Sequence, residues 1–187
     1  MLSYLKTFFV TPPPTAVEQK QAAEQCEKNF DFNGAIEKYK IAAEMFDNME
    51  AVSSFCTCLV SAARLSVTLE KYKEAAELYE RVSLKTRYNS LLKWSNTKHL
   101  FHASLCRLAL NNLEMDKYEE MLLHTSFKNS REGKFLIELI EAIENSDIQL
   151  FTDVVKEFET ITKLSMWETS LLLKIKTKFD QCTFLLS

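Results

Sequence analysis

Glycine and proline are scarce in this chain, and so are the structures that depend on them. Only two glycines occur, Gly34 and Gly133, and the three prolines all lie in the run 12–14. Tight β-hairpins rely on these residues, so their scarcity argues against a β-sheet protein. A glycine-rich loop that cradles nucleotide phosphates is excluded for the same reason. The composition therefore predicts an all-α fold.

A strong charge of either sign is also missing. The net charge is −3, and the sequence pI is about 5.7. Surfaces that follow nucleic-acid phosphates normally carry a clustered basic excess, so we expect no nucleic-acid partner. The sequence has no nucleophile elbow and no paired-cysteine metal motif. We therefore expect neither an enzyme nor a bound cofactor.

Long hydrophobic runs and disulfide spacing are absent as well. The apolar stretch 1–10 is interrupted by Lys6, and about 20 apolar residues are needed to cross a bilayer. No transmembrane helix is expected there, and no convincing cleavage site indicates a signal peptide. The five cysteines are an odd number without framework spacing, which indicates a reducing, cytoplasmic setting.

What the chain does contain is a pattern that repeats after 40 residues. It occurs in "FNGAIEKYKIAAEMF" (32–46) and in "YKEAAELYERV" (72–82). Within each copy the matched residues follow helical spacing and form one stripe. A period of this length predicts a tetratricopeptide-like solenoid of helical hairpins. The matched pairs are Phe32 with Tyr72, Ala35 with Ala75, Ile36 with Ala76, Tyr39 with Tyr79, and Ala42 with Val82.

The apolar periodicity places helices along most of the chain. Beyond residue 130 the repeat register is lost, and a C-terminal bundle with Trp167 near Phe135, Leu139 and Phe158 is predicted. Three parts follow: an apolar segment 1–14, helical hairpins 15–125, and a bundle with a tail 126–187. Residues 83–93 and 124–130 are expected to be turns or loops. Helices are expected over 15–29, 33–47, 50–67, 70–82, 94–111, 116–123, 130–145, 147–162 and 166–179.

Two clusters of polar residues stand out on these helices. His99, His102 and Cys106 share one face and are ligand types that suit zinc. No fourth ligand is evident from the spacing, so we interpret them as core or groove residues and predict no metal site. Glu138, Glu141 and Glu144 form an acidic strip. The strip is either a solvated surface or a docking site for a basic partner.

The N-terminal segment offers a third surface. Leu2, Leu5, Phe8 and Phe9 are apolar and lie around Lys6. They fit an interfacial membrane contact, with the lysine at anionic headgroups. The alternative is that they pack against the first hairpin. The sequence leaves both open.

Eight stretches of the chain match one known family: "AIEKYKIAAEMF", "TCLVSAARL", "EKYKEAAELYERV", "SLLKWS", "ASLC", "KYEE", "SREGKFLIELIEA" and "VVKEFETITKLSMWETSLLLKIK". The last stretch, which contains Trp167, is the most specific. Together these stretches resemble the SNAP family, the soluble attachment proteins that couple SNARE bundles to the hexameric ATPase NSF (N-ethylmaleimide-sensitive factor). The resemblance covers about residues 22–179 and corresponds to the C-terminal half to two-thirds of a family member.

The resemblance implies a non-enzymatic adaptor, cytoplasmic and peripheral on membranes. Such an adaptor binds a syntaxin-type SNARE complex and recruits NSF for SNARE disassembly in vesicle-mediated membrane fusion. The family's acidic ATPase contacts fall on Glu141 and Glu144, and its penultimate leucine falls on Leu186. Its basic SNARE contacts fall on Lys93 and Arg131.

Other family positions differ in this chain. Neutral Asn111 and Asn145 stand at acidic positions, Thr57 stands at a basic one, and the tail "QCTFLLS" is apolar. These differences favour an alternative, a shortened and diverged SNAP that acts as a regulatory decoy. A further alternative is a tetratricopeptide-like scaffold unrelated to SNAREs. It would use the histidine cluster as a metal or catalytic site.

Overall fold

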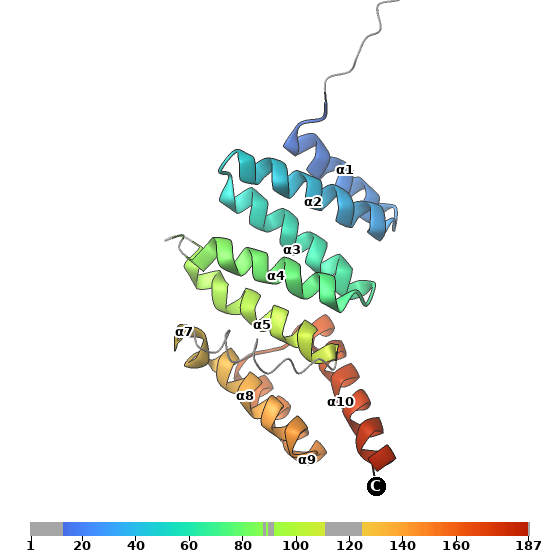
Figure 1. The fold of residues 1–187 in the computed structure, drawn as a ribbon, viewed down its shortest axis with the longest axis vertical. Helices are drawn as coiled ribbons and strands as arrows, with labels where there is room; N and C mark the ends of the chain where they lie inside the picture. Colours follow the sequence, from blue (N-terminus) through green and yellow to red (C-terminus); the bar gives the residue numbers. More distant parts are fainter. Residues whose placement is uncertain (1–12, 88, 90–91, 111–124, 187) are drawn as a thin grey trace, which may run out of the picture.

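The computed structural model of the chain describes residues 13–87, 89, 92–110 and 125–186, with the backbone alone at 93–94, 125–126 and 181–186. These residues are mainly helical, and no strand occurs among them, which confirms the all-α prediction. In Figure 1, α1 to α5 are stacked one after another, and α7 to α10 lie beyond α5. The helices are α1 (Ala16–Lys28), α2 (Phe32–Asn48), α3 (Val52–Thr68), α4 (Tyr72–Arg87), α5 (Lys93–Ala109), α7 (Thr125–Lys128), α8 (Arg131–Glu144), α9 (Ile148–Ile161) and α10 (Met166–Leu186).

Short polar side chains begin several of these helices. At α1, the Thr15 side chain accepts a hydrogen bond from the Glu18 amide at 3.3 Å, while the Glu18 carboxylate accepts one from the Thr15 amide at 2.7 Å. Asp31, Ser130 and Asp147 cap α2, α8 and α9 in the same sense. Each such cap is worth about 1 kcal/mol.

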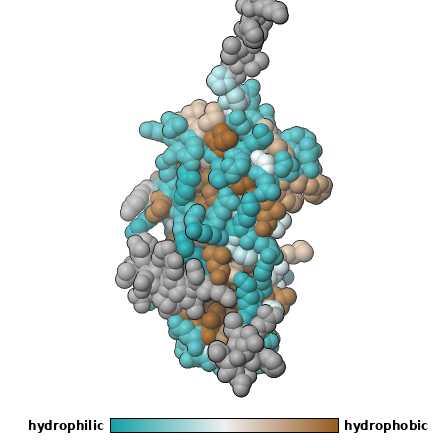
Figure 2. Space-filling view, turned by 45° about the vertical axis from the view of Figure 1, so that its right-hand side comes forward, coloured by the Kyte–Doolittle hydropathy of each residue, from teal (hydrophilic) through white to brown (hydrophobic). Residues whose placement is uncertain are grey.

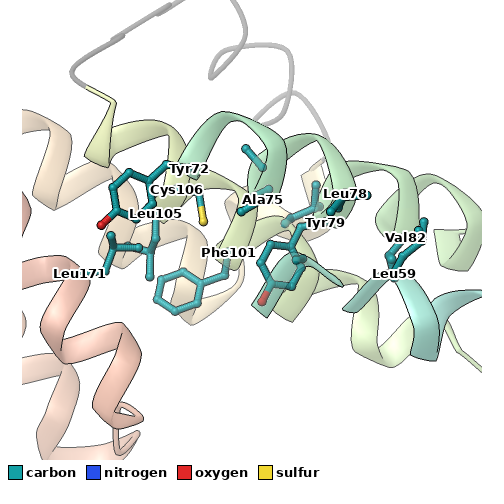
Figure 3. Packing of buried hydrophobic residues seen from close by; sticks show 14 of the residues in the cluster. Leu59, Tyr72, Ala75, Leu78, Tyr79, Val82, Phe101, Leu105, Cys106 and Leu171 are labelled. Atoms are coloured by element: carbon teal, nitrogen blue, oxygen red, sulfur yellow. The ribbon is translucent and has the colours of Figure 1, made fainter. Parts of the chain in front are cut away.

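The repeated pattern forms the buried faces of α2 and α4. Ala35 and Ala75 are fully buried, and Tyr39 and Tyr79 are almost fully buried. Because the alanines are small, the neighbouring helices approach closely, and the tyrosine rings fill the adjacent space. Figure 3 shows Tyr79 of α4 beside Phe101 of α5 in this core. The repeat is therefore a packing repeat.

Four helix ends turn without glycine. Phe30, Glu50, Glu70 and Ser146 follow α1, α2, α3 and α8, and each has a φ between 55° and 60°. The amide of the next residue bonds back to the helix, as Asp31 does to the Cys26 carbonyl at 2.9 Å. This is a Schellman-type ending, usually made by glycine, and an L-residue there costs about 1 kcal/mol. The chain accepts that cost and so needs few glycines.

Polar pairs connect α2 to α4 and to Lys71, the residue just before α4. Their partners lie 34 to 38 positions apart, close to the repeat period. Exposed pairs of this kind contribute up to about 1 kcal/mol each, so they support the register rather than create it. The pairs are Lys71 with Asn33 (2.7 Å), Lys40 with Glu74 (2.9 Å), Arg81 with Glu44 (2.6 Å), and Lys85 with Asp47.

The C-terminal helices pack around aromatic rings. Phe135 of α8 stacks on Phe158 of α9 with ring centroids 4.1 Å apart, and Phe101 of α5 lies 5.9 Å from each. Gly133 lets α8 approach α7, because a Cβ there would lie 2.1 Å from the Phe127 carbonyl oxygen. These contacts attach α7, α8 and α9 to the end of the solenoid.

Two predicted helices end later than expected, and one predicted loop contains a short helix. Helix α4 continues to Arg87 through residues expected to be a turn, since Val82, Ser83 and Thr86 still face the core. Helix α7 occupies part of the expected loop 124–130, because Phe127 is fully buried. Helix α10 continues past residue 179 to Leu186. The helix predicted over 116–123 lies outside the described residues.

The environment of Trp167 also differs from the prediction. Its ring lies 4.7 Å from His102 and 6.5 Å from Tyr79, between α10 and the solenoid. Phe135 and Phe158, expected beside it, pack instead on Phe101. Phe101 and His102, neighbours on α5, therefore belong to two different groups of rings. Phe101 packs with Phe135 and Phe158, whereas His102 packs with Trp167 and Tyr79.

Candidate partner-binding surfaces

The acidic strip lies on the exposed side of α8. Glu138, Glu141 and Glu144 are all exposed. The opposite side of the helix is buried through Phe135 and Leu139, so packing fixes the direction in which the strip faces. Three carboxylates at this spacing cover two turns of one helix and present a local negative charge. The predicted residues Glu141 and Glu144 are thus brought together and are accessible.

Arg131, predicted to contact SNAREs, makes contacts within the C-terminal helices. Its guanidinium donates to the Phe158 carbonyl oxygen at 2.7 Å and to the Thr162 hydroxyl at 2.8 Å. It also lies over the Phe158 ring, 4.8 Å from the centroid. The side chain remains half-buried. Arg131 therefore ties the start of α8 to the end of α9 and keeps only part of its surface for a partner.

Other predicted contact residues are less fully described. The side chains of Lys93 and Leu186 lie outside the described residues, although their backbone is helical. Leu5, Phe8 and Phe9 lie outside them entirely. Thr57 is exposed on α3, and its hydroxyl donates to the Ser53 carbonyl oxygen at 2.9 Å. None of the described helices is long and apolar enough to span a bilayer.

The histidine cluster is a packed part of the seam between α4, α5 and α10. Burial, followed by the charges of His102 and Lys98, lowers the pKa of His99 to about 4. Burial raises the pKa of the Cys106 thiol to about 12, so the thiol stays protonated. No three His, Cys, Asp or Glu side chains in the described part of the chain are grouped to hold a metal ion.

His102 has a partner that the sequence spacing does not reveal. Its Nε2 lies 2.8 Å from Oε1 of Glu168, 66 positions later in the chain. The other oxygen of Glu168 accepts from the Ser165 amide at 2.6 Å and from the Ser165 hydroxyl. Burial acts to raise the pKa of Glu168, but the hydrogen bonds from His102 and Ser165 outweigh it and lower the pKa to about 2. The carboxylate is therefore ionised at neutral pH.

One sequence signal for this contact was present. Ser165 and Glu168 stand three positions apart before an apolar run, which is the signature of a capping box. The signature indicates where α10 begins, but it carries no information about α5. Only the fold brings His102 to the same carboxylate.

The rest of the surface is mainly polar. Figure 2 shows a largely hydrophilic face on which hydrophobic areas are scattered. Exposed apolar side chains include Phe30, Met49, Leu84, Ile161 and Met166. They come from different turns and helices, and exposed apolar residues of this kind are normal on soluble domains.

Comparison with known proteins gives a consistent result. Residues 13–180 match the family model described as soluble NSF attachment protein, SNAP. The chain is 34% identical over 174 residues to the alpha-soluble NSF attachment protein of Dictyostelium discoideum, covering 90% of this chain and 59% of that protein. It is 37% identical over 150 residues to the beta-soluble NSF attachment protein of Bos taurus, covering 78% and 50%.

A fungal relative is also similar. The probable vesicular-fusion protein sec17 homolog of Neurospora crassa is 30% identical over 152 residues, which covers 79% of this chain and 51% of that protein. The chain thus spans between 50% and 59% of the length of these three relatives. The family match covers the hairpins and the C-terminal helices alike. The chain belongs to the soluble NSF attachment protein family.

Proposed function

We propose that this chain is a SNAP-type adaptor that holds a SNARE complex and recruits the NSF ATPase for SNARE disassembly in vesicle-mediated membrane fusion. The observation that carries the proposal is the family match over residues 13–180 together with the exposed acidic strip on α8. The names of its relatives refer to NSF attachment and vesicular fusion. The adaptor acts through geometry, without chemistry of its own.

The acidic strip is the proposed ATPase contact. Glu141 and Glu144 sit on a helix whose other face is buried, so the face that carries them has a fixed direction. Charges of one sign on a rigid surface steer a basic partner and set its orientation. Leu186 is proposed to add an apolar contact from the end of α10, since burying one leucine is worth about 1.5–3 kcal/mol.

The solenoid is the proposed SNARE-binding part. Stacked hairpins present an extended face that suits a rod-like partner. Lys93 and Arg131 are the proposed basic contacts. Arg131 contributes less than a free side chain, because two of its hydrogen bonds are made to α9. Binding of several copies to one rod compensates for weak individual contacts.

The proposed location is the cytoplasm, with peripheral attachment to membranes. Leu5, Phe8 and Phe9 are the proposed membrane contacts, with Lys6 at anionic headgroups. A ten-residue apolar segment binds a bilayer weakly by itself. We therefore expect attachment to depend mainly on the SNARE partner.

A second function is favoured by specific residues. Thr57 is exposed and uncharged on α3, where a basic family contact falls, and exposed Asn145 follows the acidic strip. A chain with fewer charges at both contacts could hold one partner and fail to recruit the other. Such a chain acts as a regulatory decoy that occupies SNAREs without disassembly.

Co-sedimentation distinguishes the two functions. A SNARE bundle, NSF and this chain are mixed, and each component is also omitted in turn. The adaptor predicts that NSF sediments with SNAREs only when the chain is present, and that ATP then releases the SNAREs. The decoy predicts that the chain sediments with SNAREs while NSF stays in the supernatant. If the chain binds neither partner, both functions are wrong.

A further inference from the structure

One buried polar contact joins the solenoid to α10. The His102 and Glu168 side chains are only 9% and 10% exposed, and their polar atoms lie 2.8 Å apart. His102 belongs to α5, the last described helix of the solenoid, and Glu168 belongs to the first turn of α10. Among the described residues, this is the most buried contact between a carboxylate and a basic side chain.

Two aromatic rings pack against the imidazole. Trp167 of α10 meets it edge-on, with centroids 4.7 Å apart, and Tyr79 of α4 does so at 5.1 Å. Trp167 and Tyr79 are themselves nearly parallel at 6.5 Å. The ring of His102 therefore has little freedom to turn, and its Nε2 is held toward Glu168.

Glu168 serves two elements at once. One carboxylate oxygen meets His102, and the other accepts from the backbone amide of Ser165, which precedes α10. The first contact fixes α10 against α5, and the second fixes where α10 begins. A change at Glu168 therefore affects both the direction and the start of the helix.

The other contacts between the solenoid and the C-terminal helices are mainly apolar and depend less on direction. Next to His102, Phe101 packs on Phe135 and Phe158, and Leu171 and Leu172 of α10 are buried. Apolar contacts of this kind tolerate small changes of angle and side-chain rotation. A buried hydrogen bond does not, because an unpaired buried donor or carboxylate is costly. The seam thus combines apolar attachment with one orientation-setting contact.

Further along α10, lysines extend the attachment to the solenoid. Lys178 donates to the carbonyl oxygen of Ala109 at the end of α5, at 2.6 Å. Lys174, one turn earlier, lies over the Tyr72 ring at 5.0 Å and pairs with Glu70. These contacts lie near the surface. They guide the middle of α10, whereas the His102–Glu168 pair holds its start.

We propose that His102 and Glu168 are positioning residues that set the angle between the solenoid and the C-terminal helices α8 to α10, and so aim the acidic strip relative to a partner on the solenoid. The second half of this proposal, the aiming of the acidic strip, rests on the proposed adaptor function. If two partners are held by one chain, an altered angle weakens their simultaneous binding more than the binding of either alone. The pair therefore couples the two binding surfaces.

The first test measures the angle without any partner. Spin labels are placed through Glu37→Cys on α2 and Glu138→Cys on α8, both exposed positions, in a chain with Cys26→Ser and Cys182→Ser. The label-to-label distance distribution is measured by pulsed electron paramagnetic resonance. We expect His102→Leu to broaden or shift this distribution. His102→Gln retains a side-chain donor and should restore it.

A doubly apolar variant separates positioning from loss of folding. Removing one partner leaves a buried charge or donor, whereas replacing both restores an apolar seam. His102→Leu with Glu168→Leu should therefore melt closer to the parent than His102→Leu alone, which leaves a buried carboxylate without its partner, and should still give a broadened distribution. Arg64→Gln, which breaks a surface pair with Glu27 between two helices of the solenoid, is the control and should leave the distribution unchanged.

The second test measures the coupling. With His102→Leu and with the double variant, binding to a SNARE bundle alone should stay within about twofold of the parent, while assembly with SNAREs and NSF together weakens about tenfold. An unchanged distance distribution in both variants overturns the positioning role. An equal loss in both kinds of binding also overturns it. If the parent binds neither partner but the distribution still broadens, the adaptor function is wrong and the positioning role stands.

Discussion

At the scale of single residues, the two glycines of the chain occupy the same position within their helices but have different neighbours. Gly34 and Gly133 are both the third residue of a helix, with their amides bound by Asp31 and Ser130 at 3.0 Å. A Cβ at Gly34 would meet the end of the Asp31 side chain, whereas at Gly133 it would meet the Phe127 backbone, each at 2.1 Å. A side chain can rotate away, but the backbone of α7 cannot move without disturbing buried Phe127.

Alanine at each glycine should therefore have unequal effects. Gly133→Ala should lower the free energy of unfolding by about 1–3 kcal/mol, through overpacking against α7. Gly34→Ala should cost less, about the loss of one cap, near 1 kcal/mol. Chemical denaturation of the two variants checks this order. Equal losses would mean that α7 yields as easily as a side chain.

His99 gives the chain a specific dependence on pH. Burial, aided by His102 and Lys98, lowers its pKa from 6.5 to about 4, and its Nδ1 is buried without a hydrogen-bond partner. Because the unfolded state then binds a proton more readily, the stability from neutral His99 is complete above pH 6.5. It is lost as the pH falls toward 4.

His99→Leu should flatten this part of the stability curve. Between pH 6.5 and 4, the free energy of unfolding of the variant should fall less than that of the parent. The difference should be about 1–2 kcal/mol, after allowing for partial exposure of the His99 ring. Glu168 provides an internal reference. Because its pKa is lowered to about 2, the stability that its carboxylate contributes is lost between about pH 4.5 and 2. That second loss should remain. Denaturant titrations across this range test both statements, and a variant as pH-sensitive as the parent would contradict the role of His99.

At the scale of helices, the local pattern carried much of the prediction. The repeat identified the buried sides of α2 and α4, down to Ala35, Tyr39 and their partners, because helical spacing alone determines which residues share a face. Thr15, Ser130 and Asp147 begin the helices predicted over 15–29, 130–145 and 147–162, and each caps its helix, because capping is a contact between near neighbours. Both signals come from residues within about one or two helical turns of each other.

The features that were missed depend on distant parts of the chain. Helix α7 exists around Phe127, whose burial is completed by other elements. Trp167 was placed correctly on α10 but beside the wrong rings, since Phe101 and His102 are neighbours on α5 and face different partners. The contact between His102 and Glu168 spans 66 positions, which no spacing rule covers. The acidic strip was predictable because it lies on one helix, but its partner is not encoded there.

The strip on α8 can be tested against an equally charged control on α9. Glu141→Lys with Glu144→Lys should weaken NSF recruitment to SNAREs while SNARE binding stays unchanged. Glu157→Lys with Glu159→Lys, also exposed, changes the net charge by the same amount at a different place and should have a smaller effect. The difference should shrink with added salt, because exposed charges are screened within about 8 Å at physiological ionic strength. Equal losses for both variants at low salt would indicate a general charge effect and no specific strip.

At the scale of the whole molecule, the adaptor and the decoy differ in how they use α10. It begins at the solenoid, where Glu168 meets His102, and its backbone continues as a helix to Leu186. The backbone at the end of an anchored helix has a limited range of positions, so the contact between His102 and Glu168 also restricts where the end of α10 lies. The adaptor uses this end to act on NSF, whereas the decoy does not use it.

Leu186→Ala separates stimulation of the ATPase from assembly. We expect the variant to form the SNARE, chain and NSF assembly as the parent does, because Glu141 and Glu144 are untouched. ATP turnover by NSF in that assembly should fall by about tenfold or more, since loss of one buried leucine side chain removes about 1.5–3 kcal/mol from a contact of this kind. Leu185→Ala, the neighbouring change of the same size, is the control and should matter less if one side chain enters a specific site. Should the parent assemble with SNAREs and NSF but stimulate nothing, and Leu186→Ala change nothing further, the adaptor function is wrong at its last step. Recruitment without turnover would then leave the SNAREs occupied, as a decoy does, although NSF is bound.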